Sequence, residues 1–268
     1  MPPVKVLVKA GLSKMGLSIT RTPAPHYLSH HLRRFIRDNN VNLILDVGAY
    51  HGDYCAMLRE EIGYRGAIVS FEPSRASFEV LRSRMGADSG WRGLQYGLSD
   101  TDGSATLHTF DSGDFNSLLD LKPQLAQVYG VDASKSVTET IQLHQIDTVW
   151  PAIVRNCPTP RILVKIDTQG HDAAVFRGAA DHLEHVVGVQ TELPAIELYD
   201  GMTPMADALK LYDSHGYAPI GFFPVTYLGD FGVVTEFDVI LKRFSVETVG
   251  SVARLAESQA DVLPGGPM

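Results

Sequence analysis

Cysteine is almost absent from this 268-residue sequence: Cys55 and Cys157 are the only two, and their spacing matches no metal-binding or redox motif. Two thiols cannot supply the disulfide framework of a small secreted protein. Long apolar runs are absent too, because no stretch of about 18 apolar residues occurs and lysines interrupt the basic N-terminal region. We therefore expect a cytoplasmic protein with no integral membrane segment. An organelle transit peptide is the less favoured interpretation of the basic start.

Positive charge is scarce relative to negative charge, with 23 Lys and Arg against 31 Asp and Glu, which gives a formal net charge of −8. Non-specific affinity for nucleic acid comes from neutralised phosphates, so no nucleic-acid partner is expected. The hydrophobic fraction of 44% and the charged fraction of 20% exclude a wholly disordered chain. The length is sufficient for one large domain with a buried core.

Short apolar runs alternate with helix-like segments, a pattern typical of an α/β sheet. Strands are predicted at 42–48, 67–73, 94–100, 104–110, 137–146, 161–167, 186–192, 217–223 and 236–243, and helices at 52–63, 74–86, 172–185 and 205–216. The segment 104–110 is expected to pair with 94–100 across the DTDG turn. Residues 111–136 lack clear periodicity and predict a loop insertion or lid. The predicted organisation is a helical, basic extension at 1–40, a doubly wound Rossmann-like α/β domain at 41–245 and a tail at 246–268.

The segment LDVGAYHGDY (45–54) joins the first predicted strand to the first helix. Gly48 and Gly52 allow a sharp turn and close approach of a ligand, at the sheet edge where open α/β folds bind ligands. An ordinary glycine-containing turn is the alternative. Asp46 suits the ammonium group of an amino acid, and Asp53 at the helix N-terminus would repel a pyrophosphate. The pattern therefore favours S-adenosylmethionine over NAD.

Acidic residues also end the next two predicted strands. Glu72, in SFEP, is placed to accept both hydroxyls of a ribose. A solvated glutamate before a turn proline is the alternative for Glu72. In GLSD, Asp100 and its neighbours are expected to line an adenine pocket, with an ordinary turn aspartate as the equal alternative.

The segment LVKIDTQGHD (163–172) places further ionisable side chains at the same edge of the sheet. Lys165 and Asp167 point to one face of a strand, and a buried pair of this kind needs mutual pairing or a ligand. A structural ion pair is the alternative. His171 follows at the strand-to-helix turn and is the first candidate for a general base near neutral pH. Glu192, in QTELP, is expected to face the same crevice.

Taken together, these motifs resemble the FkbM family of S-adenosylmethionine-dependent methyltransferases over roughly residues 43–243. The resemblance implies a class I methyltransferase fold and O-methylation of a hydroxyl on a sugar, glycolipid or natural product. This sequence departs from the family's commoner KIDVEGHE pattern at Thr168, Gln169 and Asp172. These departures put a metal role in doubt, and no metal site is expected. The candidate cofactor-binding residues are Asp46, Gly48, Tyr50, Gly52, Asp53, Glu72, Pro73, Ser99, Asp100 and Asp167. The candidate catalytic residues are His171, Asp167, Lys165 and Glu192.

The expected mechanism is direct methyl transfer, in which the protein aligns the acceptor oxygen and a base removes its proton. His171 is the first candidate for this base, Asp167 orients it or the acceptor, and Glu192 is the alternate. Two rival interpretations stay open: a catalytically inactive domain that binds a nucleoside cofactor, and an NAD-dependent oxidoreductase. A homo-oligomer is possible, and the sequence does not identify the acceptor.

Overall fold

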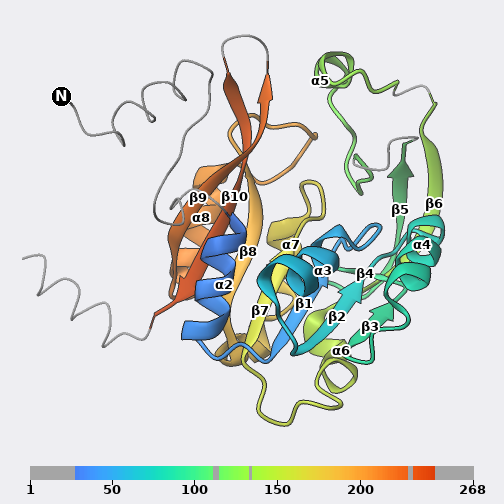
Figure 1. Cartoon of the computed structure of the whole chain (residues 1–268). Helices are drawn as coiled ribbons and strands as arrows, with labels where there is room; N and C mark the ends of the chain where they lie inside the picture. Colours follow the sequence, from blue (N-terminus) through green and yellow to red (C-terminus); the bar gives the residue numbers. More distant parts are fainter. Residues whose placement is uncertain (1–27, 111–114, 133–134, 229–231, 245–268) are drawn as a thin grey trace, which may run out of the picture.

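The computed structural model describes residues 28–110, 115–132, 135–228 and 232–244 (Figure 1). Its centre is a seven-stranded sheet of order β3-β2-β1-β7-β8-β10-β9. These strands are β1 (Leu43–Val47), β2 (Ala67–Phe71), β3 (Trp91–Leu94), β7 (Ile162–Ile166), β8 (Val186–Pro194), β9 (Tyr217–Leu228) and β10 (Val233–Arg243). The strands from β3 to β8 are parallel, whereas β10 runs antiparallel to both β8 and β9.

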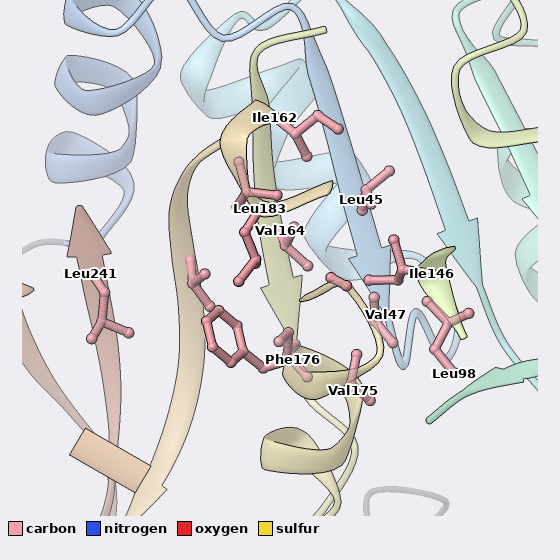
Figure 2. Close-up of a cluster of buried hydrophobic side chains, with 14 of the residues drawn as sticks. Leu45, Val47, Leu98, Ile146, Ile162, Val164, Val175, Phe176, Leu183 and Leu241 are labelled. Atoms are coloured by element: carbon pink, nitrogen blue, oxygen red, sulfur yellow. The ribbon is translucent and has the colours of Figure 1, made fainter. Parts of the chain in front are cut away.

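Helices cover both faces of this sheet. They are α2 (Leu28–Asp38), α3 (Asp53–Met57), the π-helix η1 (Leu58–Ile62), α4 (Arg75–Met85), α6 (Ile146–Ile153), α7 (Asp172–Arg177), the 3-10 helix η3 (Ala180–His185) and α8 (Met205–Ser214). The short helix α5 (Pro123–Val128) lies away from this sheet (Figure 1), and its Ala126 packs with Leu198, Tyr199 and Met202. Side chains alternate across each strand. Leu43 and Leu45 therefore join the cluster with α6, α7, η3 and α8 (Figure 2), and Ile44 joins the cluster with α2, η1 and α4. The predicted doubly wound, Rossmann-like α/β domain is confirmed.

The central strand β1 is buried at every residue, which explains why its sequence is apolar at every position except Asp46. It pairs in register with β2 and β7, so that Asp46 lies opposite Ser70 on one side and Lys165 on the other. Polar side chains from three strands therefore meet near the carboxyl ends of the strands.

The expected pairing of 104–110 with 94–100 is wrong. β3 ends at Leu94, and Gly97–Leu98 (β4) belongs to a second sheet of order β4-β6-β5. In that sheet β6 (Val137–His144) lies between β4 and β5 (Gly103–Thr109). Leu107, Ile141 and Leu143 form a small buried cluster there. A long-range apolar contact thus decides the pairing, and the local turn does not reveal it.

The observed helices differ from the predicted ones in four places. The predicted helix 52–63 continues after Met57 as a π-helix and ends at Gly63, whose φ is +77°. The predicted helix 172–185 divides into α7 and η3. Helix α6 follows β6 directly and was not predicted, and Pro151 lies inside it. Part of the predicted loop 111–136 forms the short helix α5.

The N-terminal extension is represented by α2, which buries Leu32, Phe35 and Ile36 against the sheet. The rest of the extension, residues 1–27, and the predicted tail lie outside the described residues. Within the described part of the chain, no helix is both long and apolar enough to cross a membrane.

Candidate active site

A cavity of about 450 Å³ lies where β1, β2, β7 and β8 end, a volume within the range of small-molecule sites. Its walls also include residues of β4, β5 and β6, of the segment 115–132 and of the β9–β10 hairpin. The ionisable carboxylates that line it are Glu72, Asp167, Glu192 and Glu236. Among the described residues that line the cavity there is one histidine and no lysine or arginine. The site is therefore strongly acidic.

The turn after β1 forms part of the cavity wall through Gly48 and Tyr50. Gly48 has a φ of +76°, and a Cβ atom there would lie 1.8 Å from the backbone oxygen of Asp167, so only glycine is compatible with this position. The Gly48 N–H donates to the Phe71 oxygen at 3.0 Å, which packs the turn against the end of β2. Tyr50 also has a left-handed φ, +45°, which is uncommon for a residue other than glycine.

Glu72 is held by the backbone at the floor of the cavity. Its Oε2 accepts the Tyr50 N–H at 2.8 Å and its Oε1 accepts the Ser74 N–H at 2.9 Å. The residue is 6% exposed, and burial raises the pKa of its carboxyl to about 7. Each carboxylate oxygen has a second acceptor position, so Glu72 can still accept hydrogen bonds from a ligand. Pro73, the next residue, also lines the cavity.

Asp46 and Lys165 do not line the cavity and lie behind its wall. Asp46 is fully buried, and its Oδ2 accepts hydrogen bonds from Ser70 Oγ at 3.1 Å and Cys55 Sγ at 3.3 Å. Its Oδ1 has no hydrogen bond among the described residues and lies 3.8 Å from Lys165 Nζ. Burial raises the pKa of Asp46, although Lys165 opposes that shift. The structure thus gives Asp46 structural partners and no direct exposure to a ligand.

Four other predicted cofactor-binding residues also lie outside the cavity wall. Gly52 faces Leu81 and Met85 on α4, where an added Cβ would clash. Asp53 is exposed and forms an ion pair with Arg84, so its charge does not bear on the choice between cofactors. Asp100 forms an ion pair with Arg177 at 3.7 Å, and Ser99 is buried behind His171.

The predicted pairing of Lys165 with Asp167 is present. Lys165 Nζ donates to Asp167 Oδ2 at 3.0 Å, and the lysine side chain is 9% exposed. Burial alone would lower the pKa of Lys165, but Asp167 and Asp46 raise it above its ordinary value. The lysine therefore stays charged, and Asp167 presents its carboxylate to the cavity with a fixed cation behind it.

His171 lines the cavity at the start of α7. Its Nε2 lies 3.0 Å from Ser99 Oγ. Burial lowers the pKa of His171, so that the imidazole is neutral at pH 7. The Asp167 carboxylate accepts its hydrogen bonds from Lys165 and Gln169, whereas the His171 ring contacts Ser99. Of the two expected roles of Asp167, orienting His171 or orienting the acceptor, the second fits these contacts better, and it stays a prediction.

Glu192 and Glu236 face the cavity from β8 and β10. Burial, together with Asp167, Glu236 and Asp238, raises the pKa of Glu192 well above its ordinary value. Burial, with Asp167 next, raises the pKa of Glu236 to about 7. Sequence reasoning missed Glu236. Glu236 lies in the first half of β10, which runs antiparallel and so begins where the parallel strands end, but the direction of that strand is set by the folded sheet and cannot be read from the local sequence.

Gln169 and Tyr199 also belong to the site. Gln169 lines the cavity and its Nε2 donates to Asp167 Oδ1 at 3.0 Å and to Glu192 Oε2 at 3.4 Å. The buried Tyr199 hydroxyl donates to Gln169 Oε1 at 2.7 Å. The sequence marked Gln169 only as a departure from the family pattern. In the part of the chain that the structure describes, no group of three or more His, Cys, Asp and Glu is arranged to hold a metal ion.

Comparison with known proteins gives a family match. Residues 46–218, more than half of the chain, match the family model described as "Methyltransferase FkbM domain". No curated protein matches the sequence at a significant level.

Several solved structures are similar at low identity. A methyltransferase FkbM from Methylobacillus flagellatus KT shares 15% identity, with a TM-score of 0.44, over 75% of this chain and 44% of that one, so this chain spans less than half of its length. A putative O-methyltransferase from Klebsiella pneumoniae shares 13% identity, with a TM-score of 0.43, over 91% of each chain. The O-methyltransferase TomG from Streptomyces achromogenes, involved in tomaymycin synthesis and solved with SAM, shares 12% identity, with a TM-score of 0.44, over 91% of each chain.

Proposed function

Because the chain belongs to the FkbM methyltransferase family, we propose that it uses S-adenosylmethionine to methylate a hydroxyl group of a small acceptor such as a sugar, glycolipid or natural product. The observation that carries this proposal is the acidic lining of the cavity: four carboxyl groups line it, none of the described lining residues is a lysine or arginine, and a cation in the cavity favours the ionised carboxylates. A cofactor with a sulfonium and an ammonium group complements such a cavity, whereas a pyrophosphate would be repelled.

The residues present fit this cofactor. Glu72, held by two backbone N–H groups, has acceptor positions left for the two ribose hydroxyls. Leu98, Ile141 and Leu143 supply an apolar wall next to it for a flat base. Asp167, backed by Lys165, lies at the centre of the same edge and would face the positively charged end. Tyr50 and Pro73 would complete the wall around the adenosine.

When bound, S-adenosylmethionine supplies a methyl group on a positively charged sulfur. The protein then has to align the acceptor oxygen and remove its proton. Glu192 is the favoured base, because it faces the cavity, only one long hydrogen bond occupies its carboxyl group among the described residues, and the positive charge of a bound cofactor would favour its ionised form. His171 is the alternate, because its Nε2 already contacts Ser99. Glu236 would bind the acceptor beside Glu192.

Both rivals can be tested against this proposal. An NAD-dependent oxidoreductase would have to place a pyrophosphate in a cavity lined by carboxylates, which is unfavourable. An inactive binding domain would bind the cofactor without turnover. The proposal keeps the expected cytoplasmic location and the possible homo-oligomer as predictions.

The deciding experiment is transfer of a labelled methyl group from S-adenosylmethionine into panels of free sugars, glycolipids and hydroxylated natural products. We expect one class to become labelled by the wild-type protein. Glu192→Gln should lower turnover by about 10²–10⁴-fold, the usual contribution of a general base, and His171→Ala by much less. The reverse order would make His171 the base, and no labelling in any class would favour the inactive-domain alternative.

A further inference from the structure

The side chain of Gln169 bridges the two carboxylates at the centre of the cavity. Its Nε2 lies 3.0 Å from Asp167 Oδ1 and 3.4 Å from Glu192 Oε2. Its Oε1 lies 2.7 Å from the hydroxyl of Tyr199, which is fully buried. Ionised carboxylates only accept hydrogen bonds, so the amide must turn its NH₂ toward them and its oxygen toward the tyrosine hydroxyl. Three partners thus fix the orientation of one amide.

The backbone holds Gln169 in this place. Its φ is +51° and that of Gly170 is +97°, both in the left-handed region. Ser117 Oγ donates to the Gln169 backbone oxygen at 2.7 Å. A Cβ on Gly170 would lie 3.2 Å from Leu119 and from Met202, so the turn is enclosed on its other side. A left-handed non-glycine residue is costly and is kept only where the surroundings determine it.

The two bridged carboxylates differ in their other partners. Asp167 also accepts a hydrogen bond from the charged Lys165 at 3.0 Å. The Glu192 carboxyl group accepts, among the described residues, only the hydrogen bond from Gln169. The amide is therefore the one donor that orients Glu192 in the described part of the chain, and it separates that carboxylate from Asp167.

We infer that Gln169 is a positioning residue for Glu192: its amide, oriented by Tyr199, holds the carboxylate that faces the acceptor and keeps a neutral group between two acids. A glutamate at position 169 would put a third carboxylate in contact with these two. The catalytic meaning of this arrangement rests on the proposed methyl transfer, whereas the arrangement itself can be tested without cofactor.

The groups that face Glu192 set its protonation. Burial is the largest cause of its raised pKa. The acidic Asp167 after β7, Glu236 and Asp238 on β10, and Asp172 on α7 raise it further, and Lys165 on β7 is the cation that opposes them. Donation from Gln169 to the ionised form also opposes the shift. Replacing that donor by a carboxylate should therefore move the titration of Glu192 upward.

The test is a titration of the cofactor-free protein followed by NMR of ¹³C-labelled glutamate carboxyl groups. The Glu192 signal is identified by its loss in Glu192→Gln, made in the wild-type and in the Gln169→Glu background. We expect Gln169→Glu to raise the midpoint by about one pH unit or more, as a like charge in contact does. Gln169→Asn tolerates the left-handed backbone and adds no charge, so it should raise the midpoint by less than half as much.

A midpoint for Glu192 that is the same in wild type and Gln169→Glu would overturn the inference. If Gln169→Glu does not fold, Tyr199→Phe serves in its place, because it releases the amide oxygen, and we expect a smaller upward shift. No shift there would overturn the inference equally. Because no cofactor is present, these titrations are independent of calorimetry with S-adenosylmethionine, in which a failure would instead count against the proposed function.

Discussion

In the proposed function, Glu72 is the residue that would contact the cofactor most directly. Its two oxygens each accept one backbone N–H, from Tyr50 and from Ser74. The side chain at position 72 must therefore accept a hydrogen bond at each of its two terminal atoms. In Glu72→Gln one backbone N–H would face an NH₂ group in either orientation of the amide, and the charge would be lost.

We expect Glu72→Gln to weaken S-adenosylmethionine binding by about 10- to 100-fold, since a hydrogen bond to a charged group contributes about 1.5–3 kcal/mol. Asp53→Asn is the matched control, because Asp53 follows the same turn but is exposed and paired with Arg84. Calorimetry should find that the Asp53→Asn variant binds S-adenosylmethionine with the affinity of the wild-type protein. Equal losses in the two variants would mean that Asp53 contacts the cofactor, which its exposed position on α3 contradicts.

Cofactor binding should also release protons. The pKa of Glu72 and that of Glu236 are raised to about 7, and that of Glu192 is raised as well, so part of this set is protonated at neutral pH. A cation in the cavity favours the ionised forms. We expect affinity for S-adenosylmethionine to increase from pH 6 to pH 8, with proton release seen by calorimetry in buffers of different ionisation enthalpy. An affinity for S-adenosylmethionine that decreases from pH 6 to pH 8 would contradict this prediction.

Some of the residues at the site could be predicted from the sequence and others could not, for physical reasons. Glu72, Asp167 and His171 follow buried strands and Glu192 lies near the end of one, so their position at the sheet edge could be inferred from local pattern. Asp46 and Lys165 also adjoin that edge, but strand pairing turns them toward each other behind the wall. The roles of Glu236, Gln169 and Tyr199 depend on contacts between distant segments, which no local pattern contains.

Among the elements, the segment 115–132 is the one that spans the cavity. The Tyr129 hydroxyl donates to Thr235 Oγ1 on β10 at 2.9 Å, and Leu121 forms a β-bridge with Tyr199. Lys122 forms an ion pair with Glu197 at 3.0 Å. These contacts and a buried cluster of Leu121, Ala126, Leu198, Tyr199 and Met202 fasten this segment to the domain, and its predicted role as a lid stays a prediction.

We expect amides of α5, within this segment, to exchange hydrogen faster than those of β1 in the cofactor-free protein and to slow when S-adenosylmethionine is added. Tyr129→Phe removes the hydrogen bond to Thr235 and should speed exchange in α5 while leaving β1 unchanged. Exchange in α5 as slow as in β1 without ligand would rule out a lid.

The elements also show where sequence patterns suffice. Strands buried on both faces, such as β1 and β7, were predicted within a residue or two because continuous apolar runs end at glycine or aspartate. Helix α6 was missed because Pro151 argues against a helix. The order of β4, β6 and β5 was missed because Leu107, Ile141 and Leu143 meet only in the folded chain.

At the scale of the whole molecule, the raised carboxyl pKa values link stability to pH. Folding raises the pKa of Glu72 and that of Glu236 from 4.5 to about 7, and the pKa of Asp172 from 3.8 to about 6. Between the unfolded and folded values the folded state holds more protons, so the free energy of unfolding falls as pH rises. The contribution of these three carboxyl groups to the free energy of unfolding is fully present below about pH 4. It is lost as the pH rises through their pKa values in the folded state, about 6 to 7.

We expect the cofactor-free protein to unfold at a lower temperature at pH 8 than at pH 6, and added S-adenosylmethionine to reduce the difference. Glu236→Gln should flatten the dependence because it removes one of the raised groups. Glu79→Gln, at an exposed position on α4, is the control and should leave it unchanged. A melting temperature that increases over this range would contradict the raised pKa values of these carboxyl groups.

The central claim is that the acidic cavity binds S-adenosylmethionine, and the most direct measurement is calorimetric titration of the wild-type protein at pH 8 with S-adenosylmethionine and, separately, with NAD⁺. We expect saturable binding of one S-adenosylmethionine per chain, weakened by Glu72→Gln, and no measurable binding of NAD⁺. Binding of NAD⁺ with similar or higher affinity, or no binding of S-adenosylmethionine at millimolar concentration, would contradict this claim.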